Sequence, residues 1–117
     1  MPLSIKRIYD DPAPTDGFRV LVDRLWPRGI PKDSAEIDEW AKDAAPSSDL
    51  RKAYHADEIT FAEFSNRYRQ ELDQGGAQPL IDRVSAGEAV TLVYAARDTE
   101  QNHAMVLRDY IHEKAHA

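Results

Sequence analysis

Three stretches of the chain have the apolar pattern of β-strands. Residues 3–9 (LSIKRIY) alternate imperfectly between apolar and polar side chains, residues 18–23 (FRVLVD) contain three consecutive aliphatic residues, and residues 89–96 (AVTLVYAA) form the most apolar run of the chain. Continuous apolar runs are typical of strands that are buried on both faces of a sheet. The sequence therefore predicts three strands, of which the last is central.

After the second strand the apolar spacing changes to the period of a helix. Asp33 and Glu36 have the spacing of a capping box, which favours a helix that begins here and ends at Pro46. The side chains expected on the buried face of this helix are Ile37, Trp40, Ala41 and Ala44.

Four further helices are expected from capping residues and apolar stripes, three before the last strand and one after it. The last helix is expected to bury Ala104, Leu107 and Ile111. The residues expected to begin or end these helices are Ser47, Thr60 with Glu63, Gly75-Gly76, Pro79, Gly87, and Asp98 or Thr99.

This order of elements predicts an α/β fold. We expect a small central, mainly parallel sheet of about three strands, with helices packed around it and a helical insert between strands two and three. The length of 117 residues fits one domain that spans residues 1–117.

The composition is that of a soluble globular protein, with 42% hydrophobic and 31% charged residues. There is no cysteine, which excludes disulfides and thiolate metal sites. No apolar run approaches the roughly 20 residues of a membrane span, and Met1–Ser4 lack the basic and apolar regions of a signal peptide. A cytoplasmic location without membrane association is therefore expected.

The net charge of −6 is unevenly distributed. Residues 1–32 contain six Lys or Arg and four Asp or Glu, whereas the remainder contains nine and seventeen. Nucleic-acid binding requires clustered basic residues, and the acidic remainder argues against it. The basic N-terminal region suits a small anionic ligand better.

The most distinctive segment follows the second strand and has the sequence VDRLWPRG, residues 22–29. Pro27 restricts the backbone, and Gly29 can adopt a positive φ. Arg24, Trp26 and Arg28 are therefore expected on a rigid turn at the carboxyl end of a strand, which is where α/β proteins bind their ligands.

The third strand also ends in charged residues, Arg97 and Asp98. If strands two and three are parallel neighbours, these side chains meet Asp23 and Arg24 at one edge of the sheet. The first turn of the last helix would add polar groups, and a helix N-terminus attracts anions and disfavours the imidazolium form of a histidine. The residues that would join the site from this turn are Asn102 and His103.

A purely structural explanation of these residues remains open. Asp23 has possible partners in Arg24 and Arg97, and tryptophans more often pack in a core than bind a ligand. Arg51 and His55 join the site only if the helical insert folds over the strand ends. No phosphate-binding glycine loop, serine-nucleophile elbow or nicotinamide fingerprint is present, so no cofactor is expected.

The C-terminal stretch HEKAH, residues 112–116, matches a zinc-protease pattern. A catalytic zinc requires a third protein ligand, and only Ala117 follows in the chain. We therefore interpret this stretch as a solvated helix end and expect no metal.

Several short motifs, in the same order over nearly the whole chain, resemble the bacterial YeaO-like family. They are KRIY (6–9), DG (16–17), VLVDRLWPRG (20–29), APS (45–47) followed by LR (50–51), and NHA (102–104). The resemblance implies a small cytoplasmic α/β domain without an established reaction. Longer relatives place a cysteine-histidine-arginine string where this chain has Asn102-His103-Ala104, so the resemblance does not imply a thiol mechanism here. The motif positions that it implies are Asp23, Arg24, Trp26, Arg28, Gly29, Pro46, Ser47, Arg51, His55, Asn102 and His103.

Three hypotheses follow. In the first, the protein binds a small anionic, phosphate- or nucleotide-like molecule, with Arg24, Arg28 and Arg51 as anion ligands and Trp26 as a wall of the pocket. His103 with Asp23 or Asp98 would then supply acid–base catalysis. In the second, the Arg/Trp turn is a non-catalytic docking site for a protein partner. The third, a nucleic-acid-associated regulator, fits the charge least. The sequence does not indicate an oligomeric state.

Overall fold

The computed structural model describes residues 3–116, with the backbone alone at Ser34. Met1, Pro2 and Ala117 lie outside the described residues. The expectation that the chain lacks a signal peptide rests in part on Met1 and Pro2.

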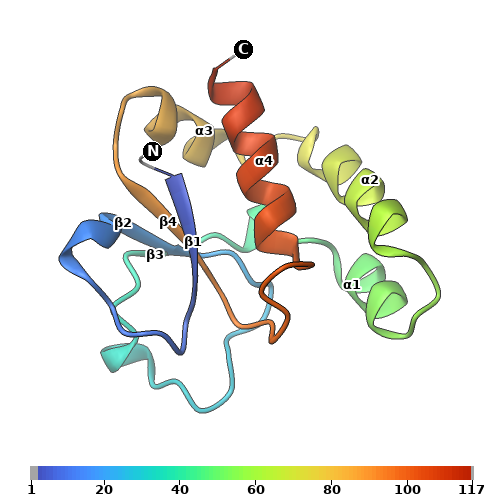
Figure 1. The fold of residues 1–117 in the computed structure, drawn as a ribbon, viewed down its shortest axis with the longest axis horizontal. Coiled ribbons are helices and arrows are strands. Elements are labelled where there is room, and N and C mark those ends of the chain that lie inside the picture. Colours follow the sequence, from blue (N-terminus) through green and yellow to red (C-terminus); the bar gives the residue numbers. More distant parts are fainter. Residues whose placement is uncertain (1–2, 117) are drawn as a thin grey trace.

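The sheet consists of parallel strands in the order β1-β4-β2-β3 (Figure 1). The predicted α/β class and the central position of the most apolar strand are confirmed, because β4 pairs with both β1 and β2. The predicted number of strands was wrong, because the sheet has four strands rather than about three. The strands are β1 (Leu3–Arg7), β2 (Phe18–Leu21), β3 (Glu39–Trp40) and β4 (Val90–Tyr94).

The two faces of the sheet are covered differently. Val90, Leu92 and Tyr94 of β4 belong to the larger core, which also contains the buried side chains of the helices. Val93 belongs to a second, smaller core on the other face, covered by side chains of the segment that follows β2. The partly buried side chains that pack on this smaller core include Trp26, Ile30, Ile37 and Trp40.

Four α-helices are described, and several begin at the predicted caps. The Ser47 side chain accepts a hydrogen bond from Leu50 N, and the Thr60 side chain accepts one from Glu63 N. None of the described helices is both long enough and apolar enough to span a bilayer. The helices are α1 (Ser48–His55), α2 (Phe61–Leu72), α3 (Gln78–Ser85) and α4 (His103–Ala115).

The helix expected between Asp33 and Pro46 was a wrong prediction. This segment forms two short 3-10 turns, η2 (Lys32–Ser34) and η3 (Lys42–Ala44), on either side of β3. The reason is a long-range pairing, in which Asp38 N donates to Arg19 O and Arg19 N donates to the Asp38 carboxylate, both at 2.8 Å. Glu36, the expected capping-box residue, has a φ of +52° and so interrupts any helix at this point. A further 3-10 turn, η1 (Pro14–Asp16), precedes β2.

The start of the last helix also differs from the prediction. Asn102, rather than Asp98 or Thr99, caps α4, and its Oδ1 atom accepts from Met105 N at 2.9 Å. Asp98 instead accepts hydrogen bonds from Glu100 N and Gln101 N. The residues between β4 and α4 therefore form a separate turn.

Candidate functional site

The carboxyl ends of β2 and β4 meet at one edge of the sheet, as expected for parallel neighbours. Asp23, two residues after the end of β2, connects these ends, because its Oδ2 atom accepts a hydrogen bond from Ala95 N at 3.1 Å. Asp23 is thus held by the backbone that follows β4.

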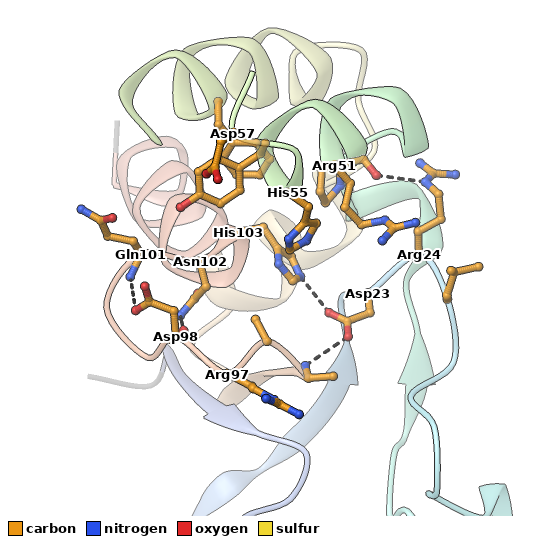
Figure 2. A pocket seen from close by; sticks show the side chains of 16 residues that line it. Asp23, Arg24, Arg51, His55, Asp57, Arg97, Asp98, Gln101, Asn102 and His103 are labelled. Atoms are coloured by element: carbon orange, nitrogen blue, oxygen red, sulfur yellow. Dashed lines mark hydrogen bonds and ion pairs between the residues drawn. The ribbon is translucent and has the colours of Figure 1, made fainter. Parts of the chain in front are cut away.

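His103 reaches the same carboxylate from the first turn of α4. Its Nε2 atom lies 2.8 Å from Asp23 Oδ1, and the two side chains are each 14% exposed (Figure 2). These two atoms are at ion-pair distance but lack hydrogen-bond geometry, and neither has a hydrogen-bond partner elsewhere in the described chain. The second ring nitrogen, Nδ1, is not among the buried unpaired atoms. The contact therefore orients the imidazole and leaves Nδ1 available.

Asn102 holds the turn before α4 in place. Besides its capping bond, its Nδ2 atom donates to Asp98 O at 2.8 Å, and only 3% of the residue is exposed. The backbone N–H groups of Gln101 and Glu100 lower the pKa of the exposed Asp98 carboxyl, which therefore stays ionised near neutral pH.

A pocket of about 600 Å³ lies between these strand ends and helix α1 (Figure 2). Its size is within the range of small-molecule sites. The helical insert does fold over the strand ends, because α1 contributes Arg51, Tyr54 and His55 to the wall. The full lining consists of Asp23, Arg24, Leu25, Pro46, Arg51, Tyr54, His55, Asp57, Phe64, Ala95, Ala96, Arg97, Asp98, Gln101, Asn102 and His103.

Three arginines line the pocket, and none of them forms an ion pair with a carboxylate of the described chain. Arg24 is tied to backbone, since its Nε atom donates to Pro46 O at 3.0 Å and its guanidinium reaches Ala45 O at 3.4 Å. Arg51 is half-buried, and its Nε atom is buried without a hydrogen-bond partner. Arg97 is exposed at the rim.

Trp26 and Arg28 are not among the residues that line this pocket. The Trp26 ring packs edge-on against Trp40 with centroids 5.3 Å apart, and its Nε1 atom donates to Ile30 O. Arg28 is exposed, and its carbonyl oxygen accepts from the Tyr9 hydroxyl at 3.4 Å. The structure thus leaves these two outside, as it does the motif positions Gly29 and Ser47. It brings together the other predicted site residues, which are Asp23, Arg24, Arg51, His55, Arg97, Asp98, Asn102 and His103.

Several pocket residues were not predicted from the sequence. Tyr54 lies three residues after Arg51 on α1, so helical spacing places the two on the same face and was a usable signal. Burial, followed by the nearby Asp98 and Asp57 carboxylates, raises the pKa of the Tyr54 hydroxyl. Asp57 and Gln101 lie in turns, where no periodic pattern predicted them.

Another missed feature is a buried ion-pair cluster around Asp16, away from the pocket. The Asp16 carboxylate binds Lys6 Nζ at 2.9 Å and Arg19 at 2.6 Å, and it accepts a hydrogen bond from Ala13 N. Burial raises the pKa of Asp16, but these hydrogen bonds outweigh burial and lower the pKa to about 2. We assign this cluster to stability, because the Asp16 carboxylate pairs with both cations and lies away from the pocket.

The HEKAH stretch ends α4 on the surface. The rings of His112 and His116 lie 4.6 Å apart, while Glu113 pairs with Arg69 of α2. Within residues 3–116, no three histidine, aspartate or glutamate side chains are grouped so that they could hold a metal ion.

Comparisons with known proteins identify relatives over nearly the whole chain. Residues 2–117 match the family model described as the inactive DUF488-N3 subclade. The uncharacterized protein YeaO of Escherichia coli K12 is 43% identical over 112 residues, covering 95% of this chain and 97% of YeaO. The uncharacterized proteins Rv3073c of Mycobacterium tuberculosis and Mb3100c of Mycobacterium bovis are each 44% identical over 103 residues, covering 88% of this chain and 87% of each relative. No solved structure matches the chain significantly. On this evidence the chain belongs to the YeaO-like family, within the DUF488-N3 subclade.

Proposed function

We propose that this protein binds a small anionic, phosphate- or nucleotide-like ligand in the pocket at the carboxyl ends of β2 and β4. The observation that carries the proposal is the Arg51 guanidinium, which lines the pocket with a buried, unpaired Nε atom. A buried donor without a partner costs about 1–3 kcal/mol. An anion that pairs with the guanidinium in the pocket supplies an acceptor that this side chain lacks.

Two further features support an anion at this position. Arg24 is held in the pocket wall by its bonds to the backbone of residues 45–46, so little side-chain entropy is lost when it contacts a ligand. The first turn of α4 opens on the pocket through Asn102 and His103, and a helix N-terminus stabilises negative charge.

A thermal-shift screen tests the proposal. Phosphate, sulfate, nucleotides and sugar phosphates are compared with chloride at constant ionic strength, for the wild type, Arg51→Met and Arg28→Met. Arg28 is the matched control, because it is a second arginine of the candidate set but lies outside the pocket. A ligand at about 100 times its Kd stabilises the folded state by about 2.7 kcal/mol, which raises the Tm by several degrees.

We expect one class of anion to stabilise the wild type and Arg28→Met but not Arg51→Met. Equal shifts for all three proteins would reject the proposed site, and so would the absence of any shift.

Acid–base catalysis on the bound anion is the second candidate, and the contact between His103 and Asp23 favours it. A carboxylate that orients an imidazole is a recurrent arrangement of general bases. The description of the matching family model as inactive, and the absence of any cysteine, favour binding without turnover. Catalysis and binding without turnover are distinguished by incubating each stabilising phosphate ester with the protein and following the ³¹P NMR spectrum of the ester. Turnover that His103→Gln abolishes would establish catalysis, whereas an unchanged spectrum supports binding alone.

The hypothesis of a protein-docking turn has less support. It required an exposed Arg/Trp patch, but the Trp26 ring is engaged by Trp40 and Ile30. Binding of nucleic acid is opposed by the net charge of −6.

A further inference from the structure

Charge is separated across the pocket. Arg24 and Arg51 lie on one side of it, and Asp57 and Asp98 lie on the opposite side, with the imidazole of His103 between them (Figure 2). Of the other charged residues in the lining, Asp23 is held by Ala95 N and His103, and Arg97 is exposed. The remaining four give the pocket a cationic end and an anionic end for the same ligand.

The two carboxylates at the anionic end lack cationic partners. Among the described residues, the Asp57 side chain has neither an ion pair nor a hydrogen bond, and Asp98 binds only backbone N–H groups. Both carboxylates act electrostatically on the Tyr54 hydroxyl, which also lines the pocket. Their negative charge therefore acts on at least one group that lines the pocket.

This arrangement constrains the ligand. A molecule that carries only negative charge gains from the arginines but is repelled at the other end, where two like charges face it. A molecule that also carries an ammonium or similar cationic group removes this repulsion and pairs with the free carboxylates. Complementary charges at both ends also fix the orientation of the ligand.

We propose, building on the anion-binding function above, that the ligand is zwitterionic: an amine that carries a phosphate or carboxylate group. The anionic group contacts Arg51 and Arg24, and the cationic group contacts Asp57 and Asp98. The class of ligand is thereby narrowed from anions in general to phosphorylated or carboxylated amines.

Two matched series of probes test this inference by calorimetry at constant ionic strength. One series consists of alkyl phosphates from ethyl to hexyl, and the other of the ω-aminoalkyl phosphates of the same chain lengths. We expect at least one aminoalkyl phosphate to bind about fivefold more tightly than the alkyl phosphate of equal length, as expected for one to two partly screened ion pairs.

Two variants test whether the anionic end of the pocket causes the preference for aminoalkyl phosphates. Asp57→Asn is expected to reduce the ratio of the two affinities by about threefold. Asp49→Asn is the control, because Asp49 is an exposed carboxylate of α1, the helix that precedes Asp57, and does not line the pocket. It is expected to leave the ratio unchanged.

The outcomes separate the two proposals. Equal affinities for both series at every length, or a preference that Asp57→Asn does not reduce, overturn the zwitterionic ligand. If the alkyl phosphates still bind in an Arg51-dependent manner, the anion-binding function stands alone. If neither series binds, this inference fails, and the thermal-shift screen described above decides whether the anion-binding function stands.

Discussion

The Nε2 atom of His103 lies 2.8 Å from the Oδ1 atom of Asp23, although the two residues are far apart in the sequence. Asp23 follows β2, and His103 opens α4. The other oxygen of Asp23 accepts from Ala95 N, directly after β4. A single carboxylate therefore fixes three segments around the floor of the pocket, and the shape of the pocket depends on it.

The first prediction concerns this carboxylate. Asp23→Ala leaves the Ala95 N–H without an acceptor and removes the carboxylate beside the buried Nε2 atom of His103. We therefore expect it to lower the free energy of unfolding by about 2 kcal/mol. Asp23→Asn keeps an acceptor for Ala95 N and should cost clearly less. Urea unfolding monitored by circular dichroism measures both. Equal losses for the two variants would show that this hydrogen bond does not stabilise the fold.

The second prediction concerns the buried Asp16. Because its pKa is lowered from 3.8 to about 2, its ion pairs stabilise the folded state above pH 4, and this stabilisation is lost as the pH falls toward 2. The depressed pKa corresponds to about 2 kcal/mol. The difference in unfolding free energy between the wild type and Asp16→Asn should therefore shrink by about this amount between pH 5 and pH 2. A difference that is constant over this range contradicts the assignment.

The third prediction concerns the N-cap of α4. Asn102→Ala removes the acceptor for Met105 N and the donor to Asp98 O, and we expect it to destabilise the fold by about 1–2 kcal/mol. Asn102→Ser retains a capping oxygen and should recover part of this loss, while Thr99→Ala, at the cap position that the sequence had suggested, should have almost no effect. A larger loss for Thr99→Ala than for Asn102→Ala would place the start of the helix elsewhere.

The elements that the sequence predicted correctly are those whose signals are local. The unbroken apolar run of β4 and the caps Ser47 and Thr60 each act within a few residues, and each element lies where the pattern placed it. The convergence of Asp23 with Asn102 and His103 was also predictable, because parallel strands end at the same edge of a sheet.

The segment of residues 33–45 was not predictable in this way. The apolar residues of this segment have helical spacing, but in the structure Asp38 pairs with Arg19 of β2 instead. This pairing joins residues that only the folded chain brings together, so no local pattern predicts it. The same applies to Trp26, whose neighbour Trp40 comes from this misassigned segment. The pocket wall formed by α1 likewise depends on how the insert packs, which no local pattern specifies.

The fourth prediction distinguishes the two interpretations of this segment. If Glu36 were part of a capping box, Glu36→Gly would destabilise the protein by about 1 kcal/mol. In the structure Glu36 has a positive φ, which glycine adopts without strain. We therefore expect Glu36→Gly to leave stability unchanged or to increase it by up to about 1 kcal/mol, as measured by thermal unfolding.

The central claim, that the Arg51 guanidinium binds a ligand anion in the pocket, is tested most directly by NMR. The Nε–H signals of the arginines are followed in ¹H–¹⁵N spectra while inorganic phosphate is added at constant ionic strength and pH. We predict that the Arg51 signal shifts and saturates as the site fills, while the Arg28 signal outside the pocket does not move in a saturable way. If Arg51 does not respond while the spectrum changes elsewhere, or if nothing saturates, the anion site is not where we have placed it.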